Sequence, residues 1–193
     1  MKFILTPNPD PPFNLRRISL PYDSRNVVFN TEDDLIQRVI RRNKQVGYIP
    51  CESEAERTEC LNEYAAKHPN LSPIILPPPG PHYVVDEIDL PGGEVNAEND
   101  YFFDGWEWLN NRCKVNMPKA RIIHMDRIRV VRNAELVKLD VAFMRAIEAG
   151  DVVEQQRIAA LKQELRDIPQ TFDLSSFRTP NTLRAAWPQG LPR

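Results

Sequence analysis

Proline placement constrains the fold of this chain more than any other feature. The 193 residues include 18 prolines but only 7 glycines. Proline has a fixed φ and no backbone N–H, which excludes it from helix interiors and from central strands. Because proline is abundant and glycine scarce, we expect stiff, extended segments and not flexible linkers.

The pattern along the chain predicts an α+β fold built from short regions in series. Helix-capping signals at Thr31 and at Ser53–Glu56 predict two helices near the N-terminus, the second ending near His68. Strand candidates precede them at residues 17–20 and 26–29. The expected regions are an extended N-terminal arm (1–14), a small α/β module (15–68), a proline-rich linker (69–100), a β-hairpin (101–116), an antiparallel helical hairpin (117–168) and an extended C-terminal arm (169–193).

The linker contains Pro77–Pro79 followed by Pro81, a sequence that favours polyproline II. Such a segment is either a rigid spacer or a ligand for an SH3-type groove. Flanking arginines are absent, which favours the spacer. The prolines at 7, 9, 11 and 12 likewise predict an N-terminal arm that does not enter a sheet as a central strand.

Aromatic residues dominate the expected β-hairpin, and Asn110–Asn111 supplies its turn. An exposed aromatic strand is an edge that needs a cover. Either a helix of the same chain or a neighbouring subunit can provide that cover. The interface candidates in this region are Phe102, Trp106 and Trp108.

Two apolar stripes at helical spacing predict the helical hairpin. The first comprises Met125, Ile128, Leu136, Leu139, Phe143 and Ile147, and the second Ile158, Leu161, Leu165 and Ile168. If the first helix runs unbroken from Pro118 to Ala149, it is about 48 Å long. Gly150–Asp151 should end it and cap its successor, which we expect Pro169 to stop.

The C-terminal arm carries spaced apolar residues that suit docking into pockets of a partner. They are Phe172, Phe177, Leu183 and Trp187. The alternative is that Trp187 folds back onto the chain's own helices.

Charge is distributed unevenly. Residues 1–100 carry 10 basic and 16 acidic residues, a net −6, and residues 101–193 carry 15 and 11, a net +4. A basic cluster that includes Arg121, Arg127 and Arg129 is either a solvated helix face, a contact with the acidic half of a neighbour, or a nucleic-acid surface. The pI of about 6.0 and the lack of a nucleic-acid-binding motif argue against nucleic acid.

No catalytic or metal-binding pattern appears in the sequence. The three cysteines, Cys51, Cys60 and Cys113, form no CxxC pair, and we expect them to be reduced. We therefore expect no enzymatic activity, no cofactor and no metal. Three consecutive apolar residues near the N-terminus are too few for a signal peptide or a membrane span.

The last part of the chain, roughly residues 117–188, carries the motifs IR..RN..L...D, GD, I...KQ.LRDIPQ and a closing WP. In this order they resemble tail-assembly chaperones and tail structural proteins of bacteriophages. The resemblance implies a structural protein of the viral tail, baseplate or tail-fibre attachment, located in the virion and assembled in the host cytoplasm. Its partners would be other tail proteins and further copies of itself. A non-virion assembly chaperone is the alternative, and a nucleic-acid-binding module is a third option with less support.

Overall fold

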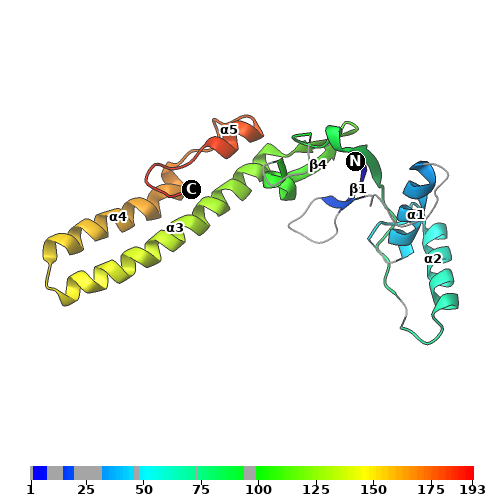
Figure 1. Ribbon diagram of the computed structural model, residues 1–193, viewed down its shortest axis with the longest axis horizontal. Helices are drawn as coiled ribbons and strands as arrows, with labels where there is room; N and C mark the ends of the chain where they lie inside the picture. Colours follow the sequence, from blue (N-terminus) through cyan, green and yellow to red (C-terminus); the bar gives the residue numbers. More distant parts are fainter. Residues whose placement is uncertain (1, 8–14, 20–31, 46–47, 73, 94–98) are drawn as a thin grey trace. The chain divides into compact units, whose positions relative to one another are not determined.

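The computed structural model describes residues 2–7, 15–19, 32–45, 48–72, 74–93 and 99–193 (Figure 1). The chain divides into two compact units, Met1–Lys114 and Val115–Arg193. The first unit mixes strands and helices, and the second contains a helical hairpin. This confirms the α+β expectation at a coarse level.

The first unit is organised around β1 (Lys2–Pro7), which lies between β2 (Leu15–Ser19) and β3 (Tyr83–Asp86) and pairs antiparallel with both. The predicted N-terminal arm is therefore wrong for this segment, which is a central strand. The reason is that the prolines start only at Pro7, the last residue of β1. Residues 3–6 keep their N–H groups for the ladders, and their side chains are at most 1% exposed.

The predicted linker at 69–100 is also wrong, because much of it belongs to the fold. Besides β3 it contains the short 3₁₀ helix η1 (Glu87–Asp89), and both Leu76 and Leu90 are buried. The Gly80 N–H donates to the carbonyl of Cys51 at 2.9 Å. The ladder partner of β3 lies near the N-terminus, so local composition gave no sign of the pairing.

The two predicted helices of this unit are present as α1 (Glu32–Gln45) and α2 (Glu54–Lys67). Ile36 and Ile40 of α1 pack with Ile4 and Ile49 in a small core. The Ser53 hydroxyl accepts from the Glu56 N–H and so begins α2 as predicted. The expected cap Thr31 and the expected strand 26–29 lie outside the described residues.

The β-hairpin is confirmed over a shorter range, β4 (Trp106–Leu109) and β5 (Arg112–Val115). Asn110 and Asn111 have φ values of +54° and +57°, as a two-residue type I′ turn requires. The preceding segment is a 3₁₀ helix, η2 (Asn99–Gly105), and not part of the strand. Phe102 is buried at a kink between two 3₁₀ turns of η2, where its backbone is not helical (φ −110°, ψ 24°).

The second unit is built on α3 (Met117–Glu148) and α4 (Val152–Thr171), which runs back beside α3 (Figure 1). The Asn116 side chain caps α3 by accepting from the Lys119 N–H, and Asp151 caps α4 by accepting from the Glu154 N–H. Gly150 takes the left-handed conformation between them, with φ +68°. The unbroken long helix and the antiparallel hairpin are thus confirmed.

The predicted C-terminal arm is wrong, because residues 172–193 fold back along the first half of α3 (Figure 1). Pro169 lies inside the last turn of α4 and does not stop it, since one lost hydrogen bond there is offset by burial of the neighbouring Ile168. A further helix, α5 (Pro180–Ala185), starts at Thr179 with a capping box. Pro180 stands at the start of this helix, where proline is well tolerated.

Candidate interaction surface and polar network

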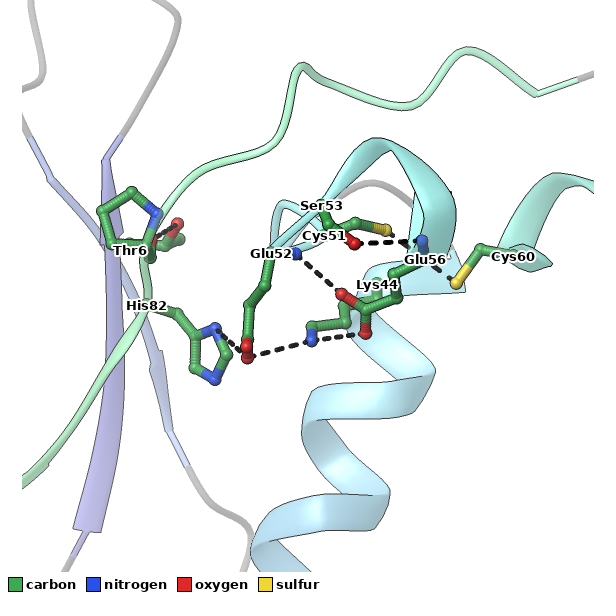
Figure 2. A network of polar contacts seen from close by, with 9 residues as sticks. Thr6, Lys44, Cys51, Glu52, Ser53, Glu56, Cys60 and His82 are labelled. Carbon is green, nitrogen blue, oxygen red and sulfur yellow. Dashed lines mark hydrogen bonds and ion pairs between the residues drawn. The ribbon is translucent and has the colours of Figure 1, made fainter. Parts of the chain in front are cut away.

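A network of charged side chains joins α1, α2 and the segment before β3 in the first unit (Figure 2). Lys44, at the end of α1, is only 6% exposed. Its Nζ lies 2.7 Å from Glu56 Oε1 and 3.4 Å from Glu52 Oε1. The other oxygen of Glu56 accepts from the Glu52 N–H at 2.7 Å. The network therefore fixes the loop that leads into α2.

The electrostatics of this network favour the charged forms of Lys44 and Glu56. Burial opposes the charge of Lys44, but the hydrogen bond and charge of Glu56, aided by Glu52, raise the pKa of Lys44. Burial acts to raise the pKa of Glu56, yet the Lys44 hydrogen bond outweighs it and the pKa falls. The nearby His82 has a lowered pKa because of burial and the Lys44 charge.

Two thiols lie beside this network. Cys51 Sγ and Cys60 Sγ are 3.9 Å apart, and both cysteines are free. Burial, with the hydrogen bond to Cys60, raises the pKa of Cys51 to about 11, which keeps it a thiol at neutral pH. Within the described residues, no group of three or more His, Cys, Asp or Glu side chains is arranged to hold a metal ion.

The aromatic interface candidates of the first unit are largely covered by their own chain. Phe102 is 3% exposed and Trp106 is fully buried, so neither offers a surface to a partner. The Arg17 guanidinium lies 5.5 Å from the Trp106 ring centre. Trp108 is half-buried and stacks on Tyr83, with ring centres 4.0 Å apart. The contacts to these tryptophans thus come from the same chain, but from Arg17 of β2 and Tyr83 of β3 instead of the helix that was considered as a cover.

The predicted anchors of the C-terminal segment belong to the core of the second unit. Leu183 is fully buried, and Phe172 and Trp187 pack against a cluster of Ile128, Ile168 and Leu191. Phe177 is half-buried. The structure therefore favours the alternative reading, in which Trp187 folds back onto the helices.

Polar contacts hold the same segment on α3. Arg121 Nε donates to the Leu174 carbonyl at 3.0 Å, and its Nη2 donates to the Phe177 carbonyl at 3.0 Å. The fully buried His124 ring contacts the Ala186 carbonyl through Nε2 at 2.7 Å. The sequence predicted that Arg121 belongs to a basic surface. Its guanidinium instead donates hydrogen bonds within the second unit.

The remaining members of the basic cluster are exposed on α3. Arg129 pairs with Asp126 one turn earlier at 2.7 Å, and Arg127 is exposed. Surface pairs of this kind contribute little to stability. The three arginines therefore do not act as one basic patch.

A second apolar stripe on α3 was missed by the sequence reasoning. We call it the α3 seam and define it as Val130, Ala134, Val137, Val141 and Met144. The four larger side chains are 70%, 62%, 49% and 55% exposed in that order. The predicted buried stripe was also wrong at Ile147, which is 45% exposed. The steps of four and three residues along the seam are present in the sequence. They are less prominent than the more apolar stripe that faces α4.

Comparison with known proteins gives no relative: no family model, no curated protein and no solved structure matches this chain. Among the described residues, no helix has both the length and the apolar character needed to cross a membrane.

Proposed function

We propose that this chain is a non-enzymatic structural protein of a bacteriophage particle. Its place would be the tail, the baseplate or the attachment site of a tail fibre, and it would act through contacts with other tail proteins. The motifs within residues 117–188 suggest this class of protein. The exposed α3 seam is the observation that carries the proposal.

The seam supports a role in assembly because it is apolar, regular and placed on a rigid element. α3 has 32 residues, and all of the seam except Val130 lies in its second half. Exposed valine and methionine in a continuous row are costly in water, and such patches mark interaction sites. Val152 and Val153 at the start of α4 are also exposed, at 59% and 78%.

A non-virion assembly chaperone, the alternative function, would use the same seam in a different way. A chaperone would cover the apolar surface of a tail or fibre protein and then leave. A nucleic-acid-binding role has less support, because Arg121 binds backbone carbonyls of its own unit and Arg129 is paired with Asp126.

Quantitative mass spectrometry of purified particles tests the proposal. A structural component is present in a fixed, reproducible ratio to the other tail proteins. A chaperone is abundant in the infected cell and absent from the particle, and that result would contradict the structural role.

A matched pair of variants ties the test to the seam. Val137→Glu places a charge on the seam, whereas Ile122→Glu changes a residue of the same helix with nearly the same exposure, 61% against 62%. We expect particles to lack the first variant and to contain the second. Equal incorporation of both would show that the seam has no role in assembly.

A further inference from the structure

The α3 seam has the spacing of a coiled coil. Its residues follow one another at intervals of four, three, four and three, which is the alternation of heptad positions a and d. Ala134 and Val141 stand at a, and Val130, Val137 and Met144 at d. The α4-facing side of α3 is separate from it and holds the buried Ile128 and Ala146. The seam can therefore meet another helix without disturbing the hairpin.

We propose that the α3 seam pairs with the α3 seam of a second copy of this chain, parallel and in register. The inference rests on the proposed function, since it names the partner of the surface on which that function depends. Two helical hairpins then lie side by side, with the two α3 helices in contact and each α4 on the far side of its own α3.

Charges limit the length of the pairing. The heptad position before Val130 is Arg127, and the position after Met144 is Glu148. Like charges of two copies would meet at both places, so the apolar contact is confined to residues 130–144. This stretch is about 21 Å long at 1.5 Å per residue. A seam of two heptads predicts a reversible dimer.

Charges beside the seam select a second copy in the parallel orientation. Asp140 stands at heptad position g and Arg145 at position e. In a parallel dimer, residue g of one helix meets the e residue five positions further along the other, so Asp140 of each copy meets Arg145 of the other.

The opposite orientation is disfavoured by the same residues. In the antiparallel register that places Val137 opposite Val141, Asp140 would face Asp140 of the second copy, and Lys138 would face its own counterpart; in the register that places Val137 opposite Ala134, Asp140 would face Asn133 and lose the Arg145 partner. Asp140 also pairs with Lys162 of α4 within the chain, yet its side chain is 58% exposed. It therefore has room for a second cation. Because the pattern is complementary to itself, the fitting occupant is a second copy.

Sedimentation velocity of the full chain tests the association. Concentrations from about 1 µM to about 200 µM cover the range expected for a short apolar seam. We expect a shift from monomer to dimer for the wild type and for Ile122→Glu. Val137→Glu should weaken the dimer by at least about tenfold, because a buried carboxylate would face its copy. A wild-type monomer throughout, or a dimer that Val137→Glu leaves unchanged, would overturn the proposal.

Cysteine cross-linking tests the orientation. In a parallel dimer the two copies of residue 137 face each other, so Val137→Cys should form a 137–137 disulfide, identified by peptide mapping. Of the native cysteines, Cys51 and Cys113 are buried. In an antiparallel dimer residue 137 faces residue 141 or residue 134, depending on the register. Cross-links that form only when Val137→Cys is mixed with Val141→Cys or with Ala134→Cys would therefore overturn the parallel arrangement.

The inference and the proposed function can fail separately. A chain that is monomeric in solution but present in particles at a fixed ratio overturns pairing with a second copy and keeps the structural role, and another tail protein then covers the seam. A chain that dimerises through the seam but is absent from particles keeps the dimer and overturns the structural role.

Discussion

The two halves of α3 have different surroundings although they belong to one continuous helix. In the first half Ala120, His124 and Ile128 are fully buried, because the C-terminal segment lies over them. From Val130 onwards, mostly in the second half, the large seam side chains are about half or more exposed. Apolar spacing on a helix therefore indicates which positions are suited to burial. A different part of the chain decides which of those positions are buried.

The largest expected effect comes from removing that cover. Deletion of residues 172–193 exposes Ile128 and Ile168 and removes the buried Leu183 and Leu191. At roughly 25 cal/mol per Å² of apolar surface, this should lower the free energy of unfolding of the second unit by at least about 4 kcal/mol. Urea unfolding followed by helical circular dichroism measures it. An unchanged unfolding midpoint would mean that the segment is an independent arm.

Two neighbouring residues sharpen the comparison at single-residue scale. Ile128→Ala empties a fully buried position and should cost about 3 kcal/mol. Val130→Ala, two residues further, removes a 70% exposed side chain and should change stability by less than about 0.5 kcal/mol. Similar losses for both in the monomer would show that the seam is already covered within the chain.

A smaller effect is expected from the polar contacts that hold the C-terminal segment. Arg121→Gln removes the donors to the Leu174 and Phe177 carbonyls and should cost about 1–2 kcal/mol. Arg129→Gln is the control, because its pair with Asp126 is exposed, and it should cost less than about 0.5 kcal/mol. Chemical unfolding of both variants decides whether Arg121 is structural or part of a basic surface.

The smallest effect is a pH dependence from His124. Burial lowers the pKa of His124 below its ordinary value of 6.5, against the opposing effect of the Ala186 carbonyl, and Arg127 and Arg193 lower it further. The unfolded chain thus binds more protons than the folded chain just below pH 6.5. Stability should fall as the pH drops from 7.5 towards 5.5 and level off below the folded pKa. His82 contributes in the same direction in the first unit.

His124→Gln isolates the contribution of the second unit. The unfolding midpoint of that unit, followed by the NMR signals of α3 and α4 residues, should lose most of its pH dependence in this variant. An equally steep dependence in the variant would assign the effect to other groups.

The sequence predicted the second unit far better than the first. The bounds of α3 and α4 were predicted from local signals, namely Pro118 at the first turn and Gly150–Asp151 between the helices, although the cap Asn116 was not singled out. The place of β1 could not be predicted, because its partner β3 lies far along the chain and pairing depends on contacts that composition does not show.

The prediction for the C-terminal segment was wrong for another reason. Thr179–Pro180 is a signal for the start of a helix, whereas all of residues 169–193 were predicted to form an extended arm. Of the four residues singled out there, Leu183 is fully buried and the other three are half-buried, and the surface that covers them belongs to the same chain. The candidate surface itself, the α3 seam, could have been found by counting its steps of three and four residues.

The different exposure of the two halves of α3 can be measured most directly with two methionines of that helix. Met125 packs against the covered cluster, and Met144 belongs to the seam and is 55% exposed. The initial rate of peroxide oxidation reports how accessible each methionine side chain is. Peptide mass spectrometry measures both rates across a series of protein concentrations. We predict that Met144 reacts faster than Met125 in dilute protein and slows as concentration rises, while the rate of Met125 stays constant. A Met144 rate that equals that of Met125 in dilute protein, or that does not depend on concentration, would contradict the account.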